Sequence, residues 1–206
     1  MFQDRQQAGE ELAKALVAYR GQPGVVVIAL PRGGVVVGNV VARALSAPLD
    51  IVVPRKIGFP GHEEYAIGAI TETGEAVWNE AERARVSDEY VKEAMTHEQA
   101  EAKRRLNVYR SGRQARDVEG TIVILVDDGI ATGYTMRAAI KTLRTEAPQK
   151  IVVAVPLAPP ETVEQLRAEV DEVIALQQPR FFGAIGVHYQ EFGQVDDETV
   201  IQALLS

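Results

Sequence analysis

Residues 123–135 read VILVDDGIATGYT and decide how this 206-residue chain folds. Four apolar residues end at two neighbouring carboxylates, Asp127 and Asp128, and a short loop of small and hydroxyl-bearing residues follows. An unbroken apolar run bounded by polar residues is typical of a strand that is buried on both faces of a parallel sheet. The stretch therefore predicts a buried strand, a loop and the start of a helix.

The same alternation of strand and helix extends to both sides of this stretch. Apolar runs predict strands over residues 25–30, 49–53, 121–126, 150–155 and 172–176. Helical periodicity predicts helices over residues 4–20, 35–45, 134–144, 160–168 and 198–205. Such alternation indicates βαβ units. We therefore expect one α/β domain over residues 1–206, with about five strands in a mostly parallel sheet flanked by helices.

Residues 55–110 interrupt this rhythm and are expected to form an insertion. Glycines and a proline surround the short apolar pieces 65–71 and 75–78, which look like a loop plus a small hairpin. A long charged helix over residues 87–110 follows, with Ser87 as its N-cap. Because mobile lids usually shield reactive sites from water, residues 57–78 are the best candidate for a lid.

The loop at residues 129–135 has the chemistry of a phosphate site. Backbone N–H groups at a helix N-terminus, together with the hydroxyls of Thr132 and Thr135, can point at one phosphate. Two adjacent carboxylates repel one another, and this repulsion is relieved when ribose hydroxyls donate hydrogen bonds to them or a hydrated Mg²⁺ binds them. An isolated pair of aspartates would more often begin a turn and cap a helix. Followed by this loop, the pair indicates a sugar phosphate site.

Residues 123–135 resemble the signature of the type I phosphoribosyltransferases, in which two acids and a Thr-Gly-x-Thr loop follow four apolar residues. The resemblance implies that phosphoribosyl diphosphate is the donor, with Mg²⁺ carried by the donor near Asp127 and Asp128. These two aspartates would take the ribose 2- and 3-hydroxyls. The 5-phosphate would be held by Ala131, Thr132, Gly133, Tyr134 and Thr135. Members that act on 6-oxopurines have an aspartate where this chain has Ala131, which argues against a hypoxanthine or guanine substrate.

A second segment agrees with this resemblance. Pro31, Arg32, Gly33 and Gly34 follow the first core strand, where the family places a diphosphate-binding loop that often has an unusual peptide geometry. Glycines allow close backbone approach, and Arg32 supplies a fixed charge suited to phosphate oxygens. Together with the two aspartates, Arg32 is expected to carry the reaction.

Arg55 and Lys56 directly follow the second strand and could add diphosphate contacts, although a solvated loop explains them equally well. The order of segments over nearly the whole chain is similar to a subgroup of phosphoribosyltransferases whose acceptor is unsettled. The resemblance thus supports the fold more strongly than the acceptor.

The tail over residues 177–206 is expected to form a small C-terminal hood. Its candidates for stacking on a flat acceptor are Phe181, Phe182, His188 and Tyr189, although a packed tail explains these side chains equally well. In the lid, His62, Glu63 and Glu64 could supply an acid or a base, but solvated loop residues are the more frequent case.

Composition limits the other functions that the chain could have. The net charge of −7 argues against a broad nucleic-acid footprint, which needs a basic surface. Lys103, Arg104 and Arg105 lie among glutamates on the long helix, so we interpret them as an ion-paired face. The chain has no cysteine, which excludes a thiolate nucleophile. A polar N-terminus and the absence of a membrane-length apolar run lead us to expect a cytoplasmic protein without a membrane partner.

The sequence supports two hypotheses about function, and it gives less support to a third. The first is transfer of phosphoribose to a small, nitrogenous heterocyclic acceptor whose identity is unknown. The second is a regulator that senses phosphoribosyl diphosphate or a nucleotide in the same pocket without turnover. A diphosphokinase that makes the donor is the third, but the chain shows no separate ATP signature. A homodimer is expected from the resemblance alone.

Overall fold

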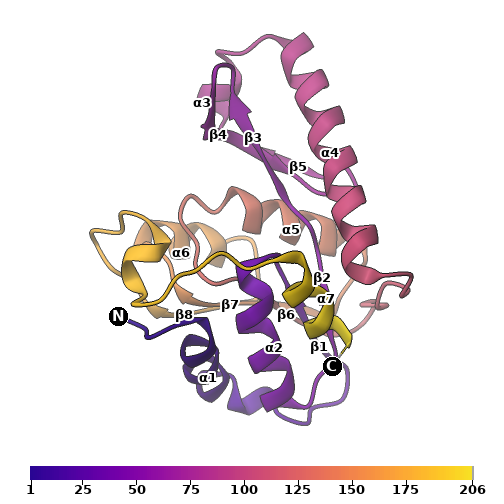
Figure 1. The fold of residues 1–206 in the computed structure, drawn as a ribbon, viewed down its shortest axis with the longest axis vertical. Coiled ribbons are helices and arrows are strands. Elements are labelled where there is room, and N and C mark those ends of the chain that lie inside the picture. Colours follow the sequence, from indigo (N-terminus) through magenta and orange to yellow (C-terminus); the bar gives the residue numbers. More distant parts are fainter. Residues whose placement is uncertain (206) are drawn as a thin grey trace.

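Five apolar segments form one central parallel sheet (Figure 1). The computed structural model describes residues 1–205, apart from the side chain of Glu64. In spatial order the strands are β2 (Leu49–Ile51), β1 (Val25–Ala29), β6 (Ile122–Val126), β7 (Lys150–Leu157) and β8 (Glu172–Gln177). All residues of β1 are buried, because helices cover both faces of the sheet. The expected α/β fold with a five-stranded sheet is confirmed, and every strand pair within that sheet is parallel.

The strand order places two loops side by side. The chain passes from β1 to its neighbour β2 and, after the insertion, returns to β6 on the opposite edge of β1. Ala29 pairs with Val126 at the carboxyl ends of β1 and β6. Ligands of open α/β sheets bind where the strand order reverses in this way. The loops after β1 and β6 therefore meet at the position where a ligand is expected.

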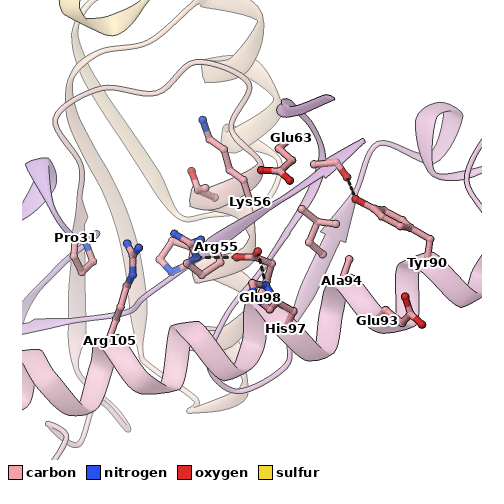
Figure 2. A pocket seen from close by; sticks show the side chains of 14 residues that line it. Pro31, Arg55, Lys56, Glu63, Tyr90, Glu93, Ala94, His97, Glu98 and Arg105 are labelled. Atoms are coloured by element: carbon pink, nitrogen blue, oxygen red, sulfur yellow. Dashed lines mark hydrogen bonds and ion pairs between the residues drawn. The ribbon is translucent and has the colours of Figure 1, made fainter. Parts of the chain in front are cut away.

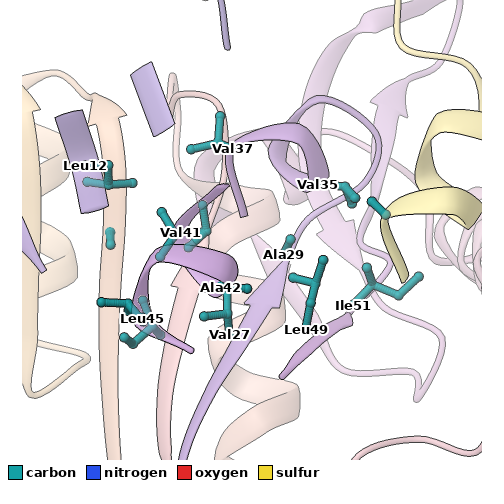
Figure 3. Close-up of a cluster of buried hydrophobic side chains, with 14 of the residues drawn as sticks. Leu12, Val27, Ala29, Val35, Val37, Val41, Ala42, Leu45, Leu49 and Ile51 are labelled. Carbon is teal, nitrogen blue, oxygen red and sulfur yellow. The ribbon is translucent and has the colours of Figure 1, made fainter. Parts of the chain in front are cut away.

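Helices cover the two faces of the sheet. On one face lie α1 (Arg5–Ala15), α2 (Gly33–Leu45) and α7 (Asp197–Leu205), whose apolar residues pack on alternate side chains of β1 and β6 (Figure 3). On the other face lie α5 (Tyr134–Thr145) and α6 (Pro160–Arg167), which pack on the remaining side chains of the same strands. Burial on both sides of the sheet holds the ends of β1 and β6 in fixed positions.

The insertion rises from the sheet as an arm (Figure 1). It contains β3 (Arg55–Phe59), β4 (His62–Ile70), β5 (Ala76–Trp78), α3 (Glu80–Arg83) and α4 (Asp88–Arg110). Ser87 accepts a hydrogen bond from the Tyr90 N–H, which confirms it as the N-cap of α4.

One expectation for the insertion is wrong. Residues 55–59 form an antiparallel strand instead of a loop, so the expected small hairpin is a three-stranded sheet. Gly58 suggested a loop, but it lies where the backbone of Glu63 approaches so closely that a Cβ would be 2.5 Å from the Glu63 carbonyl oxygen. Pairing there includes register shifts at Gly58, which a hydrophobic pattern does not reveal.

Buried polar contacts fix the base of this arm. Two nitrogens of Arg110, in the last turn of α4, each donate a hydrogen bond of 3.1 Å to the buried Asp50 carboxylate of β2. Glu72 accepts a 3.1 Å hydrogen bond from the backbone N–H of Val53. The end of α4 and the turn after β4 are thereby tied to the segment that precedes Pro54.

The remaining boundaries differ only slightly from expectation. The first helix ends at Ala15 and is followed by the 3-10 turn Val17–Tyr19. A second 3-10 turn, Ile185–His188, lies in the tail, and Asp196 accepts a hydrogen bond from the Thr199 N–H at the start of α7. Within residues 1–205, we find no helix that is both long and apolar enough to cross a membrane.

Candidate active site

The loops after β1 and β6 enclose a cavity of about 200 Å³ at the carboxyl edge of the sheet. Among the residues expected to bind the donor, seven line it: Pro31, Lys56, Asp127, Ala131, Thr132, Gly133 and Thr135. The hydrophobic side chains of Leu30, Ile130 and Ile185 complete the wall together with Pro54 and Gly129. Segments that are about a hundred residues apart in the sequence thus meet around one small space.

The loop before α5 is built to leave its N–H groups available. Gly133 is the N-cap of α5 with φ of +80°, a left-handed conformation that favours glycine, and no side chain caps the helix there. The Thr162 hydroxyl donates a 3.0 Å hydrogen bond to the carbonyl of Ala131, which steadies the loop from α6. The uncapped first turn of a helix provides N–H donors and a favourable dipole for an anion.

Asp127 and Asp128 have different surroundings, although they are neighbours. Asp127 is half-buried and lines the cavity, and one of its oxygens accepts a 2.8 Å hydrogen bond from the Asp128 N–H. Burial, and secondly the negative charge of Asp128, raises the pKa of Asp127 well above its usual value. Asp128 is only 8% exposed and is not part of the cavity wall.

The Asp128 carboxylate is paired with Arg5, the first residue of α1. The Arg5 Nε donates to Asp128 Oδ2 at 2.7 Å, and the side chains are 12% and 11% exposed. Burial raises the pKa of Asp128, although its hydrogen bond from Arg5 opposes that effect. The structure therefore brings one predicted carboxylate to the cavity and holds the other against an arginine.

The loop after β1 rests directly on these two acids. The peptide bond between Pro31 and Arg32 is cis, which agrees with the expected unusual geometry. A Cβ on Gly33 would lie 1.9 Å from Asp128 Oδ2, and one on Gly34 would lie 2.8 Å from Asp127 Oδ1. Only glycine fits at either position without displacing a carboxylate. The Arg32 side chain is 41% exposed and lies 3.5 Å from Asp197 of α7.

A larger cleft of about 640 Å³ adjoins the small cavity and is lined mostly by residues of β3 and α4 in the insertion, together with Pro31 of the loop after β1 (Figure 2). The two spaces share Pro31, Pro54, Lys56 and Thr135. Arg55 and Arg105 line the cleft, but Glu98 binds Arg55 at 2.8 Å and Glu101 binds Arg105 at 2.7 Å. Lys56 is exposed and has no ion-pair partner among the described residues. Its ammonium group is therefore available to an anion at the junction of the two spaces.

The lid residues lie on β4 or beside the cleft. Glu63 lines the cleft, whereas His62 is exposed at the start of β4 and is not part of the cleft wall. The Glu64 side chain lies outside the described residues. Arg104, like Arg105, pairs with Glu101, as expected for the ion-paired face of α4.

None of the four acceptor candidates in the tail lines either space. Phe181 is 95% exposed, and the Phe182 carbonyl lies 2.8 Å from His188 Nε2. Tyr189 is buried, and its hydroxyl donates a 2.6 Å hydrogen bond to the carbonyl of Asp128. The tail residue that does reach the small cavity is Ile185.

The donor set at the site suits a cation that arrives with a ligand. Among the described residues, no group of three or more His, Cys, Asp or Glu side chains could hold a metal ion alone. Mg²⁺ is commonly bound through one or two carboxylates together with substrate phosphates and water. Asp127, whose carboxylate faces the cavity, fits that pattern.

A family model for the phosphoribosyl transferase domain matches residues 2–191. The chain belongs to this family. Two Mycobacterium tuberculosis proteins, named provisionally as phosphoribosyl transferases, are 41% identical over 206 residues, which cover 99% of this chain. The chain spans about half the length of these curated relatives, since it covers 46% of each.

Solved structures support the same fold for this phosphoribosyl transferase domain. The Thermus thermophilus protein TT1426 is 44% identical with a TM-score of 0.82, and the match covers 99% of this chain and 97% of that one. A purine phosphoribosyltransferase from Pyrococcus horikoshii is 17% identical with a TM-score of 0.50, covering 93% and 92%. The second likeness concerns the fold alone.

Sequence patterns did not identify Arg5 or the role of the Tyr189 hydroxyl in this phosphoribosyl transferase domain. Arg5 lies on a polar helix and contacts Asp128, which is 123 residues away. No short-range pattern reports such a contact. The one available signal was the pair of buried carboxylates itself, because two adjacent acids require a nearby cation or donor.

Proposed function

We propose that the protein transfers phosphoribose from phosphoribosyl diphosphate to a small nitrogenous heterocycle and releases diphosphate. Family membership supports phosphoribosyl transfer in general. The observation that carries the specific proposal is that the loop before α5, Asp127 and the loop after β1 line one cavity of about 200 Å³. Each of these parts corresponds to a different portion of the donor.

The loop before α5 would bind the 5-phosphate through N–H groups of residues 131–135 and the hydroxyls of Thr132 and Thr135. The cavity places Asp127 beside that loop, where its carboxylate would accept hydrogen bonds from ribose hydroxyls. The diphosphate would lie against the backbone of residues 31–34 and extend into the adjoining cleft. Lys56, which lines both spaces, would bind phosphate oxygens there.

Phosphoribosyl transfer develops positive charge at the anomeric carbon while diphosphate leaves, so orientation and electrostatics supply most of the catalysis. Asp127 would hold the ribose in position and place a negative charge near the developing cation. Arg32, Arg55 and Lys56 would attract the leaving diphosphate. Mg²⁺, when bound with the donor near Asp127 and Asp128, would neutralise diphosphate charge.

An acceptor would approach the sugar beneath the tail, where Ile185 reaches the cavity. Phe181, Phe182 and His188 stay candidates for contacts with it, while the hydroxyl of Tyr189 is already engaged by Asp128. A homodimer also stays a prediction.

The test is donor consumption with Mg²⁺ against a panel of purine, pyrimidine and pyridine acceptors. We expect turnover with one class of acceptor and loss of turnover in the double variant Asp127→Asn/Asp128→Asn. Tight binding of the donor without turnover on any acceptor would instead favour the sensing function. A wild-type protein that does not bind the donor at all would contradict both functions.

A further inference from the structure

Arg5 is the only arginine of α1, and three contacts hold its side chain. Its Nε donates to Asp128 at 2.7 Å, and another guanidinium nitrogen donates to the Gly193 carbonyl at 2.8 Å. Its guanidinium carbon also lies 3.8 Å from the centre of the Phe192 ring, within the range of a cation–π contact. A guanidinium with such partners has little freedom to turn toward another ligand.

The tail holds the same aspartate from its backbone side. The Tyr189 hydroxyl donates to the Asp128 carbonyl at 2.6 Å, and the Tyr189 ring stacks on Phe192 with 5.0 Å between ring centres. Phe2 pairs with Tyr189 through an isolated β-bridge, and its N–H donates to the His188 carbonyl at 2.8 Å. The N-terminal segment and the tail thus contact each other and together hold Asp128 through its carboxylate and its carbonyl.

Asp128 in turn supports the loop after β1. A Cβ on Gly33 would lie 1.9 Å from Asp128 Oδ2 and 2.8 Å from Arg5 Nε, so the glycine backbone rests on the ion pair itself. If Arg5 were removed, a buried carboxylate would lie unpaired beside a second acid, which is strongly unfavourable. The carboxylate would then lose the contact that fixes its position, and its packing against Gly33 would change.

We propose that Arg5 is a positioning residue for the diphosphate end of the donor: through its ion pair with Asp128 it holds the loop at Gly33 in the position that receives diphosphate. This inference rests on the proposed function. It assigns Asp128 a supporting role beneath the loop, and leaves Asp127 as the carboxylate that faces the sugar.

The role predicts a selective loss of affinity, which a general loss of folding would not produce. In the Arg5→Ala variant, affinity for phosphoribosyl diphosphate and for inorganic diphosphate falls by about tenfold or more, while affinity for ribose 5-phosphate stays within about twofold. Arg5→Lys restores part of the affinity, because an ammonium keeps the charge but lacks the planar fork that reaches both Asp128 and Gly193.

Equilibrium titrations of these three ligands with Mg²⁺, on wild type and variants, provide the test. Arg104→Ala is the matched control, because Arg104 lies on α4, is 60% exposed and pairs only with Glu101 among the described residues. Ribose 5-phosphate affinity and the thermal midpoint report whether each variant is folded. The loss of diphosphate affinity in the double variant Arg5→Ala/Asp128→Ala is compared with the losses in the two single variants. If Arg5 acts through Asp128, the effects of the two substitutions are coupled and do not add.

Equal losses for diphosphate and ribose 5-phosphate in Arg5→Ala would overturn the inference while the proposed function stands. Losses that add in the double variant would also overturn it, because Arg5 would then act without Asp128. A wild-type protein that binds none of the phosphoribosyl ligands would overturn the proposed function, and the inference with it. A selective, non-additive loss is the result that we expect.

Discussion

An alanine at position 33 would place a methyl group where the Asp128 carboxylate already lies. The new Cβ would be 1.9 Å from Asp128 Oδ2 and 2.8 Å from the carboxyl carbon. Restoring an ordinary non-bonded contact requires a shift of about 1.5 Å. Since the Arg5 Nε to Asp128 Oδ2 distance is 2.7 Å, such a shift would break that hydrogen bond.

Overpacking and the disrupted ion pair together give an expected loss of about 3 kcal/mol in the free energy of unfolding for Gly33→Ala. The measurement is urea denaturation followed by circular dichroism, with an unchanged m-value as the check that the transition is comparable. Gly193→Ala is the matched control, because a Cβ there would meet no atom within 4 Å. We expect that variant to lie within about 0.5 kcal/mol of wild type. If Gly33→Ala were as stable as the control, the packing of this loop on Asp128 would be refuted.

Three further predictions concern buried polar groups. Burial raises the pKa of Asp127, so its protonated carboxyl favours the folded state at low pH, and this stability is lost as pH rises from about 4 toward the raised pKa. Asp127→Asn should therefore gain stability relative to wild type as pH increases. Thermal denaturation midpoints that change in parallel with pH for both proteins would contradict this. Arg110→Ala leaves the buried Asp50 without its bidentate partner and should lose about 3 kcal/mol in urea denaturation, whereas Arg104→Ala, which removes an exposed ion pair, should leave the midpoint almost unchanged. Tyr189→Phe removes the donor to the Asp128 carbonyl and should lose about 1–2 kcal/mol in the same assay, and an unchanged midpoint would show that this hydrogen bond is not needed.

The sheet could be predicted from sequence because its strands are contiguous apolar runs. Residues 122–126 and 150–157 are almost entirely buried, and such runs leave little ambiguity about where a central strand lies. The helix after residue 133 was equally clear, since the loop and its hydrophobic periodicity are local features. The insertion was harder, because Gly58 indicates a loop in a single sequence but permits close strand pairing in the structure.

The site was predictable where it depends on neighbouring residues and unpredictable where it depends on distant ones. Asp127 belongs to the same continuous segment as Ala131, Thr132, Gly133 and Thr135, so their place on one cavity wall could be expected. The pairing of Asp128 with Arg5 depends on how α1 packs against the tail, and no local pattern contains that information. For the same reason, the buried position of Tyr189 could not be distinguished from an exposed stacking surface.

The central claim is that the loop before α5 binds the 5-phosphate of a phosphoribosyl donor. Its most direct test is a titration of phosphoribosyl diphosphate with Mg²⁺ into wild type and into Thr135→Val, which removes one hydroxyl from the cavity wall while keeping the side-chain shape. Thr96→Val is the matched control, because Thr96 is exposed on α4 and bonds only the Lys92 carbonyl among the described residues.

We expect Thr135→Val to lose about tenfold in affinity for both the donor and ribose 5-phosphate, since a hydrogen bond to a charged phosphate is removed. Affinity for inorganic diphosphate should be unchanged, as should all affinities of Thr96→Val. Wild-type protein that fails to bind the donor, or Thr135→Val that binds ribose 5-phosphate as tightly as wild type, would contradict the assignment of this loop.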